Sequence, residues 1–279
     1  MSGESTVTIA LLFPDLLGTY GDSGNALILA QRLRWRGIDC EVLTVRSGEA
    51  VPTGCALYVV GGGEDMPQSL AARQLGAGTG TGALNRAVES GAVVLAVCAG
   101  LQIIGTTFVG PDGLVTPGLG LLDCTTGHGR SQRAVGEVVV EAVSGLAIPT
   151  MTGYENHAGV TTLGPQCSPL GRVTHGRGNN DGSGFDGAWR GKVLGTYLHG
   201  PVLARNPALA DLLLSWAVGP LEPLDDFESE ALRRERLAAA GTSVVRDQAG
   251  RLRSRAGQLR DRTERLRSLT GRLSSSLRR

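Results

Sequence analysis

The sequence predicts an α/β fold with a mostly parallel central sheet flanked by helices, and two observations support this prediction. Continuous apolar, β-rich runs at residues 6–13, 55–60 and 92–97 are typical of strands buried on both faces. Segments with helical spacing of apolar residues, at 26–36 and 84–90, lie between these runs. Strands that alternate with helices indicate a parallel sheet.

The first strand and helix form one unit at the N-terminus. The run TVTIALLF (6–13) ends at Pro14, a Gly-rich turn occupies 18–25, and the helix at 26–36 stops at Gly37. The elements predicted after this unit are a strand at 39–45, a strand at 55–60, a helix at 84–90 and a strand at 92–97.

The middle of the chain, from about residue 110 to 173, is richer in Gly, Thr and Pro. It contains the strand-like run VGEVVVEAV at 135–143, which suggests antiparallel additions. A last short strand is predicted at 193–197. The helix predicted at 206–218 carries Leu209, Leu212, Leu213 and Trp216 on one face.

Composition excludes several classes of protein. The chain has 279 residues, 41% hydrophobic and 19% charged, so it can bury a full core and is not disordered as a whole. No stretch approaches the roughly 20 apolar residues of a membrane span, and the start MSGEST does not look like a signal peptide, so we expect a cytoplasmic protein. Five cysteines without a CxxC pair exclude a disulfide scaffold and leave at least one thiol free.

The net charge of +1 conceals an asymmetry along the chain. Residues 241–279 hold 11 Arg and 3 acids, a net charge of +8, which leaves −7 on residues 1–240. Leucines at 252, 259, 266 and 273 favour a helix in this tail, whereas glycines at 250, 257 and 271 oppose it. A disordered or weakly helical tail and a tail that contacts an acidic partner or an anionic membrane surface both remain open.

Cys98 lies between a predicted buried strand and a predicted helix, in the sequence AVCAGLQ (96–102). This is the context of a nucleophile elbow, in which a sharp turn raises the side chain out of the sheet. The start of the following helix favours a thiolate at this position. The alternative is an ordinary buried cysteine, as we expect for Cys40, Cys55, Cys124 and Cys167.

His199 follows the strand at 193–197, in the motif GTYLHGP. The carboxyl ends of parallel strands share one crevice, so Cys98 and His199 are predicted to converge there. The histidine would take the thiol proton and later give it to a leaving amine. We expect solvent exposure or a structural hydrogen bond for the other three histidines, at 128, 157 and 175.

Three glycines, Gly61 to Gly63, follow the strand at 55–60. The backbone N–H of Gly63 and that of Ala99 would form an oxyanion hole for acyl chemistry at Cys98. The spacing matches neither GxGxxG nor GxxxxGK[ST], so the sequence predicts no nucleotide site, and it predicts no metal site.

Together these motifs carry a family resemblance. VCAGLQ, the triple glycine, GYENHAG (153–159) and GTYLHGP resemble a class I glutamine amidotransferase domain of the CobB/CobQ (cobyric acid synthase) type. The order LGTYGDSGN, VVGGGEDMPQ, CAGLQ, GYENHAG, GRGNND and GTYLHGP is similar, more narrowly, to the GatD glutaminase subunits of MurT/GatD lipid II isoglutaminyl synthases. The resemblance runs from about residue 7 to residue 235.

The resemblance implies glutamine hydrolysis through a thioester on Cys98, with His199 as acid and base. It further implies that Arg133 binds the glutamine carboxylate, with Arg130 as the competing assignment, and that Gln102 lines the glutamine pocket. Asn156 and His157 fall in a segment that borders the substrate in related enzymes, where their roles could be purely structural.

The resemblance also implies a partner. A MurT-type ligase in a heterodimer would use the ammonia to amidate the D-glutamate α-carboxyl of lipid II, with ATP and Mg²⁺ on the partner and no cofactor on this chain. A different acceptor, such as a corrinoid, and a non-catalytic scaffold role are the alternatives. The implied domains are the amidotransferase domain at 5–220, a helical extension at 221–240 and the basic tail at 241–279.

Two positions depart from the amidotransferase pattern. Ala96 stands where the usual elbow has glycine, and Pro201 stands where most members have the glutamate that orients the histidine. Either the Cys98 and His199 dyad works alone or its third member comes from elsewhere. An aspartate of the partner is the candidate that the resemblance suggests.

Overall fold

The computed structural model describes residues 6–110, 112–129 and 133–241. The chain divides into two compact units, Met1–Leu237 and Ala238–Arg279, and the named elements that follow all belong to the first unit. Apart from residue 241, the predicted basic tail lies outside the described residues.

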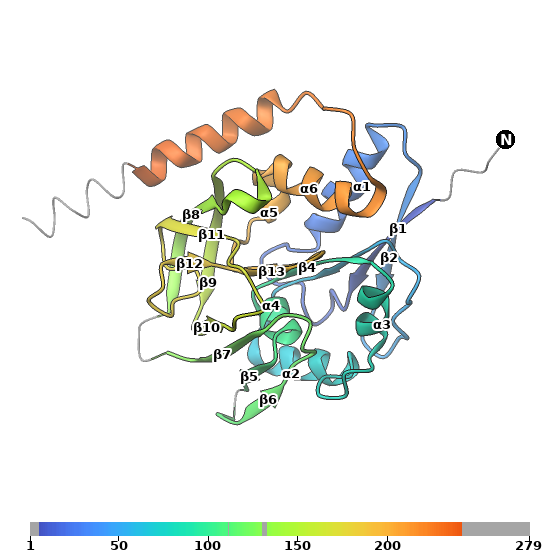
Figure 1. Ribbon diagram of the computed structural model, residues 1–279, viewed down its shortest axis with the longest axis vertical. Coiled ribbons are helices and arrows are strands. Elements are labelled where there is room, and N and C mark those ends of the chain that lie inside the picture. Colours follow the sequence, from blue (N-terminus) through green and yellow to red (C-terminus); the bar gives the residue numbers. More distant parts are fainter. Residues whose placement is uncertain (1–5, 111, 130–132, 242–279) are drawn as a thin grey trace, which may run out of the picture. The chain divides into compact units, whose positions relative to one another are not determined.

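The central sheet has six strands in the order β13-β14-β4-β3-β1-β2 (Figure 1). They are β1 (Val7–Leu12), β2 (Cys40–Val45), β3 (Leu57–Val60), β4 (Val93–Val97), β13 (Ala188–Arg190) and β14 (Val193–Thr196). All neighbouring strands are parallel except the β13–β14 pair. The prediction of a mostly parallel sheet is confirmed.

Helices cover both faces of this sheet, which explains its continuous apolar strands. One face carries α1 (Gly24–Arg34), α5 (Val202–Arg205) and α6 (Pro207–Val218), and the other carries α2 (Asp65–Gln74), α3 (Ala83–Glu89) and α4 (Ala99–Ile104) (Figure 1). Every residue of β3 and β4 is buried. A strand with both faces covered has no polar side, so alternation is absent from its sequence.

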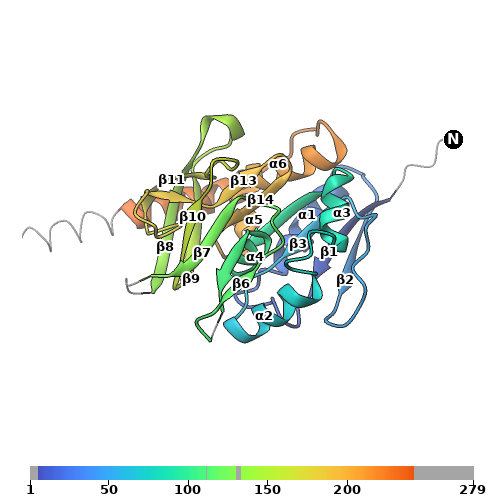
Figure 2. The same cartoon turned by 60° about the horizontal axis from the view of Figure 1, so that its bottom comes forward.

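Two smaller sheets lie beyond the β13–β14 end of the central sheet (Figure 2). The first, ordered β10-β7-β5-β6, consists of β5 (Thr107–Val109), β6 (Val115–Pro117), β7 (Cys124–His128) and β10 (Gly159–Leu163). The second, ordered β12-β11-β8-β9, consists of β8 (Ala134–Ala142), β9 (Met151–His157), β11 (Gly171–His175) and β12 (Phe185–Asp186). A short 3-10 turn at Ser144–Leu146 connects β8 with β9.

The run at 135–143 forms an antiparallel strand, as predicted, but this strand lies in a separate sheet and not in the central one. β8 pairs antiparallel with β9 along its length, from Ala134 opposite His157 to Val140 opposite Met151. An isolated antiparallel bridge joins Tyr154 of β9 to His199. The second sheet is therefore attached directly to the segment that carries the candidate histidine.

Helix α2 and the C-terminal extension differ from the sequence prediction. Helix α2 was not predicted, because its buried side, formed by Gln68, Ala71 and Ala72, has no large apolar side chain to show a helical period. The extension at 221–240 is helical only from residue 227. The non-helical stretch before it is held by Arg32 of α1, which binds Asp226, and by Arg36 just after α1, which donates to the carbonyl of Glu222.

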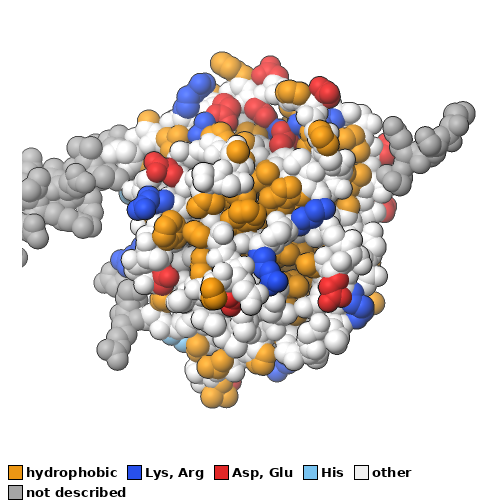
Figure 3. Space-filling model, in the orientation of Figure 1, with side chains coloured by type: hydrophobic (Ala, Val, Ile, Leu, Met, Phe, Trp, Pro, Cys, Tyr) orange, Lys and Arg blue, Asp and Glu red, His pale blue; other side chains and the backbone are white. Residues whose placement is uncertain are grey.

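The surface shows no dominant charge on the face viewed in Figure 1. Lys and Arg side chains are interspersed there with Asp and Glu, and hydrophobic side chains gather near the middle (Figure 3).

None of the described helices has the length and hydropathy that crossing a bilayer requires. All five cysteines are free thiols.

Candidate active site

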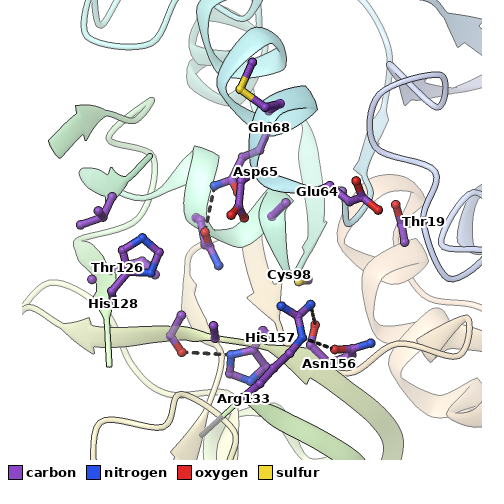
Figure 4. A pocket seen from close by; sticks show the side chains of 18 of the residues that line it. Thr19, Glu64, Asp65, Gln68, Cys98, Thr126, His128, Arg133, Asn156 and His157 are labelled. Carbon is purple, nitrogen blue, oxygen red and sulfur yellow. Dashed lines mark hydrogen bonds between the residues drawn. The ribbon is translucent and has the colours of Figure 1, made fainter. Parts of the chain in front are cut away.

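A cavity of about 450 Å³ opens beside the carboxyl ends of β3 and β4 (Figure 4). Cys98 lies at its centre. Gln68 and Asp65 of α2 form one wall, and Arg133, which precedes β8, forms the opposite wall with Asn156 and His157 of β9 (Figure 4). The cavity lies where the predicted crevice of a parallel sheet should be.

Cys98 occupies the sharp turn between β4 and α4 that the sequence predicted. Its backbone has φ 52° and ψ −107°, a left-handed conformation that is strained for a residue with a side chain. Gly100 makes the turn possible, since a Cβ there would lie 2.5 Å from the carbonyl oxygen of Val60. Cys98 is 6% exposed and lines the cavity.

His199 approaches Cys98 from the neighbouring strand, β14. Its main chain exchanges two hydrogen bonds with Tyr154, at 2.8 and 3.1 Å, which fix the backbone of the histidine. A Cβ built on Gly62 would lie 2.7 Å from Cε1 of His199 and 3.4 Å from Cβ of Cys98, so both side chains flank this glycine. The structure thus brings together the two residues that the sequence singled out.

An aspartate that the sequence analysis did not identify completes this cluster. Oδ2 of Asp22 lies 2.9 Å from Nδ1 of His199 and accepts a second hydrogen bond, also 2.9 Å, from the N–H of Gly62. Asp22 is fully buried. It belongs to the Gly-rich turn after β1, and its position after a parallel strand was the signal that could have placed it at this edge of the sheet.

The charges of the cluster follow from these contacts. Burial by itself lowers the pKa of His199, but the hydrogen bond to Asp22 and the charges of Asp22 and Cys98 outweigh it and raise the pKa to about 10. An imidazolium beside a sulfur stabilises the thiolate form of that sulfur. The arrangement therefore suits a buried thiolate–imidazolium pair.

His157 behaves in the opposite way. Burial lowers the pKa of His157 to about 4, and its Nδ1 lies 3.0 Å from the carbonyl oxygen of Gly159. Its ring stacks on Tyr197 with centroids 3.6 Å apart. A neutral, stacked histidine fits the structural hydrogen bond expected from the sequence. His128 lies at the exposed end of β7 and also lines the cavity, whereas His175 lies on β11.

The predicted oxyanion donors, Gly63 and Ala99, both line the cavity. Within the described part of the chain, the N–H of neither residue has a hydrogen-bond partner. The N–H of Gly62, by contrast, already donates a hydrogen bond to Oδ2 of Asp22. The backbone therefore leaves two amide donors beside Cys98.

Arg133 reaches the cavity from the start of β8. Its Nε donates to Oδ1 of Asn156 at 2.6 Å and its Nη2 to the main-chain oxygen of Asn156 at 3.3 Å. Asn156 in turn donates to the hydroxyl of Tyr20 at 2.5 Å. The guanidinium is thereby held in place with Nη1 still able to bind an anion. The competing residue, Arg130, lies outside the described residues.

Gln102 also lies in the cavity wall, as predicted. Its Oε1 accepts from Nε2 of Gln68 at 2.8 Å, and its Nε2 lies 3.3 Å from the hydroxyl of Tyr197.

Glu64 and Asp65, which the sequence analysis did not assign, line the same cavity on the side opposite Arg133 (Figure 4). A cation on one wall and carboxylates on the other match the two charged ends of an amino acid. No cluster of three His, Cys, Asp or Glu side chains suited to a metal is present among the described residues.

Residues 8–207 match the family of CobB/CobQ-like glutamine amidotransferase domains. The chain belongs to this amidotransferase family. A Staphylococcus aureus (strain N315) relative, the GatD subunit of lipid II isoglutaminyl synthase (glutamine-hydrolyzing), is 35% identical over 237 residues, covering 83% of this amidotransferase and 94% of the relative. The Streptococcus pneumoniae (strain ATCC BAA-255 / R6) GatD subunit is 33% identical over 213 residues, which cover 76% of this chain and 80% of that relative. The resemblance to GatD is confirmed.

The amidotransferase is also similar to a longer protein. A probable cobyric acid synthase of Methanothermobacter thermautotrophicus is 42% identical over 118 residues, which cover 38% of this chain and 23% of that protein. The match to the GatD subunits is much more extensive in both chains.

Proposed function

We propose that this chain is the glutaminase subunit of a lipid II isoglutaminyl synthase. It hydrolyses glutamine to glutamate and ammonia, and a MurT-type ligase uses the ammonia to amidate the D-glutamate α-carboxyl of lipid II. The observation that carries the proposal is the strained, buried Cys98 beside a charged His199, in a cavity that has both a cation and carboxylates on its walls. The similarity to GatD across 94% of the relative's length supports the choice of acceptor.

Glutamine is recognised by its charges. Arg133 binds the α-carboxylate through the donors that Asn156 leaves unused, and Asp65 and Glu64 attract the α-ammonium from the other wall. The side-chain amide then extends toward Cys98. This orientation converts the attack into an intramolecular event, which is a large part of any enzymatic rate gain.

The chemistry begins from the thiolate–imidazolium pair. The sulfur of Cys98 attacks the amide carbon, and the N–H groups of Gly63 and Ala99 stabilise the negative charge on the amide oxygen. His199 gives its Nε2 proton to the leaving nitrogen, the C–N bond breaks, and ammonia departs from a thioester. Neutral His199 then takes a proton from water, whose oxygen attacks the thioester and releases glutamate with the thiolate restored.

The partner accounts for the rest of the reaction. Activation of a carboxylate for amidation consumes ATP, and we place ATP and Mg²⁺ on the ligase, since the sequence of this chain has no phosphate-binding loop. The cobyric acid synthase similarity favours a second candidate, in which the ammonia goes to a corrinoid carboxylate. This second candidate ranks behind the first because the match to cobyric acid synthase covers only 38% of this chain.

The proposal is tested with the chain purified together with its partner. Ammonia release from glutamine and amidation of lipid II are measured with glutamine or ammonium as nitrogen source, before and after treatment with a glutamine-analogue electrophile. We expect labelling of Cys98 alone. In the Cys98→Ser variant, glutamine-dependent amidation should disappear and ammonium-dependent amidation should persist.

Other outcomes contradict the proposal in different ways. Labelling of a residue other than Cys98 would exclude glutaminase chemistry at this site. Loss of ammonium-dependent amidation in Cys98→Ser would indicate a scaffold role for the cysteine. Ammonia release with a partner that amidates a corrinoid and not lipid II would favour the second candidate.

A further inference from the structure

We infer that Tyr20 binds the substrate: its hydroxyl donates a hydrogen bond to the α-carboxylate of glutamine, beside the guanidinium of Arg133. Tyr20 belongs to the turn between β1 and α1 and lines the cavity. The inference rests on the proposed glutaminase function. It adds a second residue, from a different part of the fold, to the carboxylate site.

The first argument is the orientation of the Asn156 amide. An arginine side chain can only donate hydrogen bonds, so the Asn156 atom that lies 2.6 Å from Nε of Arg133 is the carbonyl oxygen Oδ1 (Figure 4). The other end of the same amide, Nδ2, therefore faces the hydroxyl of Tyr20, at 2.5 Å. Because an amide nitrogen only donates, the oxygen of Tyr20 accepts this hydrogen bond.

The second argument concerns the proton of the Tyr20 hydroxyl. A phenolic oxygen that accepts one hydrogen bond still has its own proton to donate. Within the described part of the chain, no residue accepts this proton. Tyr20 is 43% exposed and lines the cavity, so a bound ligand can supply the acceptor.

The third argument identifies which group of the ligand that acceptor is. Asn156 bonds both Tyr20 and Arg133, so the unused donors of these two side chains lie near each other. One donor is the phenolic O–H and the other is the guanidinium, whose Nη1 has no partner among the described residues. Two adjacent donors, one of them charged, match the two oxygens of a carboxylate.

The backbone of Tyr20 is fixed in a way that suits a ligand contact. Its φ is 63°, in the left-handed region that a bulky residue rarely adopts. The residue before it, Thr19, forms an antiparallel bridge with Gly62, and the N–H of Thr19 donates to the carbonyl oxygen of Gly62 at 3.1 Å. Strained residues that the surrounding structure holds in place are concentrated at active sites and ligand clamps.

The ring of Tyr20 has a separate contact. It lies against the imidazole of His199, with centroids 4.8 Å apart and the ring planes tilted by 57°. One side chain therefore touches the catalytic base with its ring and the carboxylate site with its hydroxyl. Loss of the hydroxyl alone should affect substrate binding, whereas loss of the whole ring should also affect the chemistry.

The test measures binding separately from turnover, in the complex with the partner. In a Cys98→Ser background, calorimetry gives the Kd of L-glutamine. Tyr20→Phe should raise this Kd about ten- to a hundredfold, the effect of losing a hydrogen bond to a charged group. With Cys98 intact, KM for ammonia release should rise by a similar factor and kcat should change little, whereas Tyr20→Ala should also lower kcat.

A substrate analogue shows which group the hydroxyl contacts. 4-Aminobutanamide has the side-chain amide and the amino group of glutamine but lacks the α-carboxylate. Its kcat/KM for ammonia release should be the same in the wild type and in Tyr20→Phe. Equal losses of kcat/KM for glutamine and for the analogue would overturn the inference.

A double variant distinguishes direct contact from support of Arg133. If Tyr20 acted only by holding Asn156, and through it Arg133, Tyr20→Phe would have no further effect once Arg133→Lys has broken that support. Direct contact with the carboxylate predicts a further, several-fold rise in KM in the double variant. An unchanged KM relative to Arg133→Lys would overturn the inference.

The matched control is Tyr58→Phe. Tyr58 does not line the cavity, and its hydroxyl donates to the carbonyl oxygen of Pro52 at 2.7 Å, so the control removes a hydroxyl without touching the site. Its KM and Kd should equal those of the wild type, and thermal unfolding shows whether each variant folds. If Tyr20→Phe does not fold, the KM of Tyr20→Ala decides the question.

The inference and the proposed function fail in different ways. An unchanged Kd of L-glutamine in Tyr20→Phe would overturn the inference and leave the glutaminase function intact. If the unmodified complex releases no ammonia, the proposed function fails, yet the Kd of L-glutamine for the Cys98→Ser complex still tests the contact. A Cys98→Ser complex that binds no glutamine would overturn both.

Discussion

The N–H of Cys98 donates to the carbonyl oxygen of Thr196 at 2.9 Å, which continues the parallel pairing of β4 with β14 by one bond beyond the strands. This bond fixes the register in which Val97 lies opposite Thr196. The residue after Val97 is Cys98, the proposed nucleophile, and the third residue after Thr196 is His199. The pairing of β4 with β14 therefore brings Cys98 and His199 together. The other side chains of the cavity come from loops and from other elements.

Replacement of Gly62 by alanine should disable the site without unfolding the protein. The new Cβ would lie 2.7 Å from Cε1 of His199 and 2.9 Å from Oδ2 of Asp22, both closer than carbon contacts allow. The imidazole must shift, and a misplacement of about 1 Å costs on the order of 10²-fold in rate. The measurement is kcat for ammonia release together with the thermal unfolding temperature.

The control for this substitution is Gly54→Ala, where a Cβ meets nothing within 4 Å. It should retain wild-type kcat. Full activity in Gly62→Ala would show that the imidazole tolerates displacement, contrary to the prediction.

Replacement of Arg133 by lysine should weaken glutamine binding while leaving the chemistry intact. A lysine cannot make the two hydrogen bonds to Asn156 and also face a carboxylate with a planar pair of donors. Loss of a charge-assisted hydrogen bond to the substrate corresponds to a KM increase of about tenfold or more. The measurement is KM and kcat for glutamine hydrolysis.

The matched control is Arg34→Lys, an exposed position on α1 away from the cavity, where KM should not change. A fall in kcat at unchanged KM in Arg133→Lys would assign the arginine to transition-state stabilisation. If both KM and kcat are unchanged in Arg133→Lys, Arg130 would become the residue assigned to bind the glutamine carboxylate.

The free energy of unfolding should depend on pH through His157. The pKa of His157 is lowered to about 4 in the fold, so the unfolded chain binds more protons than the folded chain between about pH 4 and 6.5. Stability contributed by this group is therefore lost as the pH falls through that range, with a slope of up to about 1.4 kcal/mol per pH unit. Denaturant unfolding at several pH values measures the slope.

His157→Gln should reduce this slope, and His175→Gln, on β11 outside the cavity, should not. An identical pH dependence in wild type and His157→Gln would mean that other groups account for acid destabilisation.

Arg32 should contribute to stability and not to catalysis. The guanidinium is 3% exposed and binds Asp211 and Asp226 through four hydrogen bonds of 2.6–2.8 Å. Arg32→Ala leaves Asp226 without its arginine and leaves Asp211 with Arg36 alone. Removal of one member of a buried ion pair costs about 3 kcal/mol or more. The measurement is the free energy of unfolding in urea.

A comparison with Arg233→Ala calibrates the effect of Arg32→Ala. Arg233 pairs with Glu230 nearer the surface, and loss of such a pair costs about 1 kcal/mol or less. Equal losses for the two variants would contradict the assignment of Arg32 as the anchor of residues 222–226 on α1.

Much of the fold was predictable because its strands and helices have local signals. Strands β3 and β4 are uninterrupted apolar runs, β1 is apolar apart from Thr8, and α6 has an apolar face at helical spacing. Helix α2 was not predictable from its pattern, because its small buried side chains carry no period. Its position over the cavity depends on packing against α4.

The sequence by itself determined the α/β class, the places of Cys98 and His199 at the ends of two strands, and the amidotransferase motifs, since each of these is encoded in a short stretch of chain. The tertiary structure decided how distant segments meet. It placed Asp22 on His199, 177 residues away in the chain, and put Glu64 and Asp65 on the wall opposite Arg133. Such pairings leave no periodic trace in a sequence. They follow from the order in which parallel strands assemble and bring their carboxyl ends to one edge.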